Sequence, residues 1–282
     1  MAIKISDQTK NAMGNWNDDS GEARLPFPAP AFWVLNGKAQ YKPLAATTPA
    51  LYFGGFATGA DELESAGTIP SSLVKHEYTP KDAQESVQVY SARNLVIAPF
   101  GRRLSSLDKE TGNRYPGYHK GASPHLQMLC YLGQRDANKI LSPICPIVIT
   151  AKGFQVGKII DAVRQWDSKT AKARKEFGAG LKSNAFYMAL GTFGDKFISE
   201  TVGQGNRQSA ITPIGVYLPA DINEKIIDDL FVGEGLVAEM AGLREQATEW
   251  RDAWKQTVKE KSIALVESDE PDIEEEEGEI PF

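Results

Sequence analysis

Five stretches between residues 87 and 218 are rich in β-branched and aromatic residues or alternate apolar with polar side chains, and this succession constrains the fold more than any other feature. The predicted strands cover residues 87–100, 125–132, 144–151, 185–193 and 211–218. Between the third and the fourth, Ile160, Val163 and Trp166 recur at helical spacing within residues 157–177. Three strands, a helix and two further strands follow the order of an OB-fold, although other small barrels share it.

We therefore predict a mainly β chain with helices, organised around an OB-like, five-stranded barrel at residues 87–220. Residues 1–86 are predicted to form an N-terminal arm and an extension packed on the barrel. Residues 221–262 are predicted to be a C-terminal helical segment, and residues 263–282 a disordered acidic tail.

Within the predicted C-terminal helix, Asp221 and Glu224 have the spacing of a capping box. Six apolar residues then recur at alternating spacings of four and three, which predicts a helical seam. They are Leu236, Met240, Leu243, Ala247, Trp250 and Trp254. The seam either packs on the protein's own barrel, which we favour, or forms a self-association surface.

The formal net charge of −6 hides a strong separation of charge along the chain. Residues 267–282 hold nine acidic residues and no basic one, whereas residues 93–207 hold 18 Lys and Arg against eight Asp and Glu. A basic middle next to an acidic end is the asymmetry expected where a groove binds a polyanion.

Binding a single strand without sequence choice requires cations for the phosphates and aromatic rings on which bases stack. The stretch 101–124, predicted to be a long loop between the first two strands, supplies both. The phosphate candidates there are Arg102, Arg103, Arg114 and Lys120, and the stacking candidates are Phe100, Tyr115 and Tyr118. Further candidates on the strands and in the other loops are Tyr131, Lys152, Lys182, Tyr187, Lys196 and Arg207.

The sequence lacks the common signatures of enzymes: the GxxxxGK phosphate loop followed by Ser or Thr, HExxH, paired cysteines in CxxC, and the GxSxG elbow. We expect no catalytic residues, no cofactor and no metal site, and we expect Cys130 and Cys145 to be buried free thiols. No apolar run approaches the ~18 residues of a membrane span, and no signal peptide is recognisable. A cytoplasmic protein, in a bacterial cell or a phage-infected host, is expected.

The chain ends in a dense carboxylate run closed by an apolar tip. The predicted partner-binding residues are Asp272, Glu274, Glu275, Glu276, Glu277, Glu279, Ile280, Pro281 and Phe282. Repulsion between like charges prevents the run from packing on itself. An apolar tip at the end of a flexible acidic segment suits a partner's pocket with a basic rim. A tail that only aids solubility is the plainer alternative.

This ending resembles the acidic C-terminal tip of bacterial single-stranded DNA-binding proteins and their phage and plasmid counterparts, over residues 272–282 only. The resemblance implies a tip that recruits replication, recombination and repair enzymes and that competes with DNA for the protein's own basic groove. Two other functions stay open: an interaction adaptor that binds no DNA, and a nucleic-acid-processing enzyme that uses the tail for recruitment.

Overall fold

The computed structural model describes residues 24–37, 53–67, 69–79, 85–136, 138, 140–193, 198–203 and 208–255. The predicted acidic tail with its tip, and the predicted groove residues Lys196 and Arg207, lie outside these ranges.

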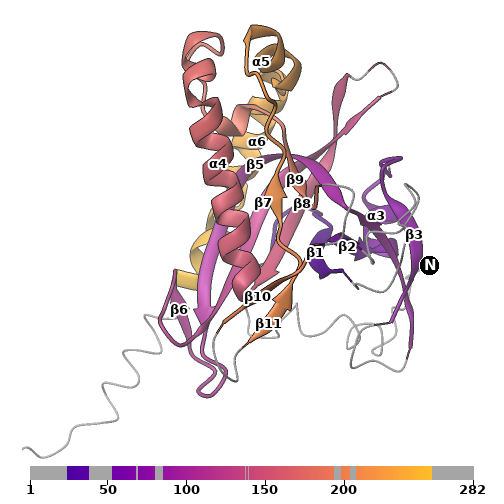
Figure 1. Cartoon of the computed structure of the whole chain (residues 1–282), viewed down its shortest axis with the longest axis vertical. Helices are drawn as coiled ribbons and strands as arrows, with labels where there is room; N and C mark the ends of the chain where they lie inside the picture. Colours follow the sequence, from indigo (N-terminus) through magenta and orange to yellow (C-terminus); the bar gives the residue numbers. More distant parts are fainter. Residues whose placement is uncertain are drawn as a thin grey trace, which may run out of the picture.

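The described residues form a large, mainly antiparallel sheet of ten strands with helices on both faces (Figure 1). The strands of the sheet are β1 (Ala31–Asn36), β2 (Gly54–Gly59), β3 (Val74–Tyr78), β4 (Val87–Ala92), β5 (Asn94–Leu107), β6 (Arg114–Pro116), β7 (Ser123–Arg135), β8 (Leu141–Lys152), β9 (Met188–Gly191) and β12 (Gly215–Val216). Their order is β12-β9-β5-β7-β8-β1-β2-β4-β3, with β6 paired to β5. The pair of β1 and β8 is parallel.

The helices are α3 (Ala60–Ser65), α4 (Phe154–Glu176), α5 (Glu224–Leu230) and α6 (Glu234–Gln246), with a 3-10 turn at Ser183–Ala185. Residues 248–255 continue as a further helical stretch after α6. β10 (Glu200–Val202) and β11 (Ser209–Ile211) make a separate two-stranded ribbon. No helix in the described part of the chain is long and apolar enough to cross a membrane.

Strand alternation divides the core into two layers, one on each face of the sheet. On β7, the side chains of Leu126, Met128 and Cys130 lie in the cluster under α4, whereas Leu129 and Tyr131 lie in the cluster under α6. α4 contributes a buried stripe that includes Val156, Ile159, Ala162 and Trp166, which recur every three or four residues. α4 and α6 consequently cover opposite faces (Figure 1).

Both cysteines are free and buried, as predicted. Burial raises the pKa of Cys145 to about 11 and that of Cys130 well above its ordinary value. Thiols held protonated in this way are poor nucleophiles.

The predicted C-terminal seam packs on the protein's own sheet. Five of its six residues, Leu236, Met240, Ala247, Trp250 and Trp254, are buried, and Leu243 packs partly buried against the same cluster. The predicted capping box is wrong: α5 is capped by Asn223, whose side chain accepts a hydrogen bond from the backbone N–H of Ile226 at 3.1 Å.

Half of the predicted loop 101–124 is strand. β5 runs on to Leu107, β6 pairs with it, and β7 already begins at Ser123. The second half of β5 shows no alternation of apolar and polar residues in the sequence. The reason is that Arg103 and Ser105, although polar, are buried on the face toward the C-terminal helix. The first predicted strand, 87–100, is in fact divided between β4 and β5.

The ladders of the described residues do not close into a barrel, so the predicted OB-like barrel is not confirmed. Three side chains nevertheless join the open end at β12 to β1. The backbone N–H of Thr212 donates to Asn36 Oδ1 at 3.0 Å, and the backbone N–H of Gly37 donates to Thr212 Oγ1 at 2.7 Å. Gln155 Nε2, at the start of α4, donates to Asn36 Oδ1 at 3.0 Å and to the Thr212 carbonyl at 2.7 Å. We call this group the Asn36–Gln155–Thr212 clasp.

Replacing Gln155 with alanine should lower the free energy of unfolding by about 1–3 kcal/mol, because a buried carbonyl loses its donor. Urea denaturation measures the loss. The matched control is Gln165→Ala, on the same helix but at an exposed position, where a change within about 0.5 kcal/mol is expected. Equal losses for the two variants would show that the clasp adds nothing beyond helix packing.

Candidate nucleic-acid interface

The side of β5 that faces away from β7 carries a gap in its strand pairing. β9 pairs with residues 94–97 of β5, and β6 pairs with residues 105–107. No strand of the described chain pairs with residues 98–104 on this side. A break of this kind in the edge of a sheet leaves room for a ligand between the elements that flank it.

A cavity of about 520 Å³ opens at this gap, and we call it the β5 notch. Its walls come from β5, from α4 on one face of the sheet, and from the helical stretch 248–255 on the other. The lining residues are Arg102, Arg103, Leu104, Leu126, Ile160, Arg164, Arg251, Asp252, Trp254 and Lys255. The notch thus gathers segments that are up to 153 residues apart in the sequence.

Five of the lining side chains are cationic and one is acidic. Arg164 pairs with Asp161 at 3.6 Å, and Lys255 pairs with Asp252 at 2.7 Å. Both are ion pairs within one helical turn, and their cationic partners are more than two-thirds exposed. Such pairs contribute little to stability, so a polyanion can compete for their cations at small cost.

Arg103 has a structural role in the notch. Its guanidinium carbon lies 4.1 Å from the ring of Trp250 and 4.3 Å from that of Trp254, and the side chain is 7% exposed. Arg103 Nε donates to Gln127 Oε1 at 2.7 Å, and Nη1 donates to the Trp250 carbonyl at 3.0 Å. These contacts anchor the C-terminal helix to β5 and leave Arg102 as the exposed arginine of the predicted pair.

A second cationic group lies farther along β5 and β7, around His125. Burial, and after it the positive charges of Lys152, Arg114 and Lys109 in that order of effect, lower the pKa of His125 to about 4. Arg114 also donates to Ser105 Oγ at 2.9 Å and has its guanidinium carbon 4.6 Å from the Trp254 ring. Trp254 thereby connects the notch to this cationic group.

The aromatic candidates divide into exposed and buried rings. Tyr118 is 76% exposed, and Tyr115 stacks on His119 with ring centroids 3.9 Å apart. Phe100, Tyr131 and Tyr187 are buried in the cluster under α6, so the structure does not offer them to a ligand. Tyr131 and Tyr187 lie on the face of the sheet opposite to α4, and α6 covers that face.

Among the remaining basic candidates, Lys120 is exposed beside Tyr118, and Lys152 lies at the end of β8 opposite His125. Lys182 is exposed just before the 3-10 turn and is not among the residues that line the notch. Sequence reasoning missed Arg164, Arg251 and Lys255. The only signal for Arg164 was the basic character of the predicted helix 157–177, and residues 221–262, which hold more acids than bases, gave none for Arg251 and Lys255.

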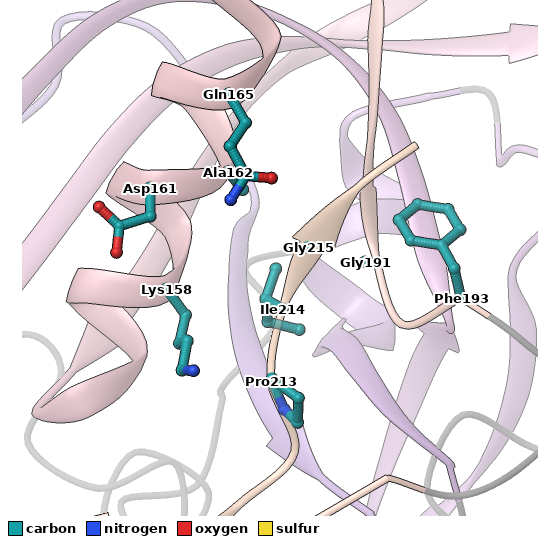
Figure 2. A pocket seen from close by; sticks show the side chains of 9 residues that line it. All are labelled: Lys158, Asp161, Ala162, Gln165, Gly191, Phe193, Pro213, Ile214 and Gly215. Carbon is teal, nitrogen blue, oxygen red and sulfur yellow. The ribbon is translucent and has the colours of Figure 1, made fainter. Parts of the chain in front are cut away.

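A smaller cavity of about 350 Å³ lies between α4 and the β9 and β12 strands (Figure 2). Lys158 and Gln165 project from α4 on the side of Ile214 and Gly215, whereas Asp161 points away (Figure 2). Lys158 forms an ion pair with Glu200 of β10. Its mixed charge makes this cavity a weaker candidate for a polyanion than the notch.

Comparison with known proteins gives no relative: no protein-family model, no curated protein and no solved structure matches the chain.

The depressed pKa of His125 predicts a specific loss of stability in acid. Because the folded protein keeps His125 neutral down to about pH 4 and the unfolded chain protonates it near pH 6.5, this contribution is complete above pH 6.5 and is lost as the pH falls toward 4. Replacing His125 with glutamine should make the free energy of unfolding fall less between pH 7 and pH 5 than in the parent protein. Urea denaturation at both pH values measures this difference.

The control for that measurement is His119→Gln, which changes an exposed ring of the same hairpin. An identical acid dependence in the parent protein and in the His125 variant would contradict the placement of His125 among three cations.

Proposed function

We propose that this protein is a non-catalytic, sequence-independent single-stranded DNA-binding protein that coats and protects the strand. We further propose that its C-terminal tip recruits replication, recombination and repair enzymes. The observation that carries the proposal is the gathering of five cationic side chains around the β5 notch, next to a second cationic group at His125.

The phosphates would lie along Arg102, Arg164, Arg251 and Lys255. These side chains come from three elements that surround the notch. Each phosphate that a cation neutralises releases counterions, so affinity should fall with salt by a slope of about 0.7 for each contact with a single strand. Arg103 contributes indirectly, because it positions the helix that carries Arg251 and Lys255.

The bases would stack on the exposed rings of the hairpin between β5 and β7. Tyr118 is the most exposed aromatic ring there, and Tyr115 is partly exposed beside it. A stacked base contributes about 1–3 kcal/mol for any of the four bases, which suits binding without sequence choice. Lys120 and Lys152 would hold the phosphates on either side of these rings.

An OB-like core is part of the proposal. In the sheet, β5, which holds the second half of the first predicted strand, lies between the second predicted strand (β7) and the fourth (β9); the third (β8) follows the second, and the fifth (β12) follows the fourth. An OB-fold is a partly open five-stranded barrel with this neighbour order. The Asn36–Gln155–Thr212 clasp links the open side through β1, where strand pairing would close a complete barrel.

The acidic tail would act as a competitor for the notch. Lys255 lines the notch, and the first acid of the run, Glu267, follows twelve residues later. Twelve residues span at most about 40 Å, so the carboxylates are tethered within reach of the notch cations. DNA and the tail would then compete for the same side chains, and a partner that captures the tip would favour DNA.

Reversing two charges in the notch should weaken DNA binding. Arg102→Glu combined with Arg164→Glu is expected to lower the affinity for labelled oligo(dT) at least tenfold at 50 mM salt, and to reduce the salt slope by about 1.4. Fluorescence anisotropy across a salt series measures both quantities. The matched control is Lys225→Glu, an exposed cation on α5 that does not line the notch.

No binding by the parent protein at low salt would overturn the proposal and favour the interaction adaptor. Turnover of polynucleotide with Mg²⁺ would favour the processing enzyme. If the double variant binds DNA as tightly as the parent protein, the notch does not contact the DNA.

Removing the tail should have the opposite effect. A chain that ends at Lys261 is expected to bind oligo(dT) several-fold more tightly at low salt, with the gain vanishing at high salt as charges are screened. The control lacks only residues 280–282, keeps every carboxylate and should bind DNA like the parent protein. Unchanged affinity after the longer truncation would exclude competition by the tail while leaving DNA binding itself untouched.

A further inference from the structure

In the described part of the chain, the last strand of the sheet, β3, leaves its outer edge unpaired. Within the described ranges it pairs with β4 alone, and it lies at the margin of the molecule (Figure 1). Its five residues are Val-Lys-His-Glu-Tyr, from Val74 to Tyr78. Unpaired backbone groups along such an edge can pair with a strand of another chain, so the side chains decide which strand fits.

The pairing with β4 fixes which side chains of β3 share a face. Lys75 and Glu77 stand opposite Tyr90 and Gln88, on one face. The other face carries Val74, His76 and Tyr78. Val74, Lys75 and Glu77 are exposed, and Val74 is 46% exposed although it is apolar.

We propose that β3 pairs antiparallel with β3 of a second copy of this chain, about a twofold axis at His76. Lys75 then stands opposite Glu77 of the second copy, and the twofold axis repeats that contact. On the other face, Val74 stands opposite Tyr78. The strand is therefore complementary to itself in charge and in apolar contact.

Charge selects this register over its neighbours. A pairing centred on Lys75 places two lysines opposite each other, and one centred on Glu77 places two glutamates opposite each other. A shift by a single residue would bring opposite faces of the two strands together. Only the arrangement centred on His76 brings unlike charges into contact.

The contacts that Lys75 already makes are compatible with this arrangement. Lys75 Nζ lies 2.6 Å from Glu64 Oε1, and its side chain remains 45% exposed. An ammonium group has three donors, so Lys75 can keep Glu64 and also bond Glu77 of the second copy. The interface is small, because each copy offers a five-residue strand, so association should be weak and should require high protein concentration.

Cysteine cross-linking tests the register directly, because Cys130 and Cys145 are buried. His76→Cys should give a disulfide-linked dimer under mild oxidation at high protein concentration, since the two cysteines face each other at the axis. Val74→Cys should cross-link several-fold less, although position 74 is more exposed than position 76. A mixture of the Val74→Cys and Tyr78→Cys proteins should again cross-link, as a heterodimer.

Charge exchange in the His76→Cys protein is the second measurement. Adding Lys75→Glu places glutamates opposite each other twice and should lower the dimer yield several-fold. Adding Lys75→Glu together with Glu77→Lys should restore the yield, although the contact with Glu64 stays broken. Equal yields for the position 74 and position 76 cysteines, or no rescue by the double exchange, would overturn the proposal whatever the protein does with DNA.

Discussion

The arrangement of this protein depends on the Asn36–Gln155–Thr212 clasp, where three distant segments share four hydrogen bonds. Gln155 lies at the start of α4, Asn36 ends β1, and Thr212 precedes β12. Because Gln155 and Thr212 are almost fully buried, these four hydrogen bonds replace contacts with water that the bonded groups lose on folding. The clasp therefore fixes where α4 begins over the sheet, and with it the position of Arg164 beside β5.

Arg103 is the second constraint, because it brings a charge into the interior. A guanidinium that is 7% exposed loses most of its hydration, and this loss must be offset by other contacts. Two indole rings, the Gln127 amide and the Trp250 carbonyl provide them. The C-terminal helix is consequently held against β5 by polar as well as apolar contacts. These contacts also position Arg251 and Lys255, the cations that this helix contributes to the notch.

The sequence predicted the elements whose periodicity follows from burial on one face. β7, β8 and α4 were found near their observed limits because Leu126, Met128 and Cys130, or Val163 and Trp166, recur at the spacing of the element.

The second half of β5 was missed because Arg103 and Ser105 are polar residues in buried positions. Nothing local in the sequence shows that two tryptophans 147 or more residues away surround Arg103. Tyr131 and Tyr187 were predicted as binding residues, but whether their face of the sheet is open depends on α6, which comes from elsewhere in the chain. The notch could not be predicted for the same reason, since it exists only where β5, α4 and residues 251–255 meet.

The single-residue bulge in β5 has a consequence for how this surface could change. Pro99 stands opposite Cys130 and Gly101 stands opposite Leu129, so Phe100 is an extra residue in the strand. Because of this extra residue, every residue that follows faces the side opposite to the one that strict alternation would give it. Arg103 is thereby turned toward the tryptophans and Arg102 toward α4. Deleting Phe100 would leave Arg102 and Arg103 on their present faces, whereas closing the bulge at constant chain length would place Phe100 opposite Leu129 and Arg102 opposite Gln127, so that the two arginines would exchange faces. A shift of the pairing by one residue, without any change of side-chain type, would thus move a charge from one face of the sheet to the other. In this strand, pairing register is as much a determinant of surface charge as composition.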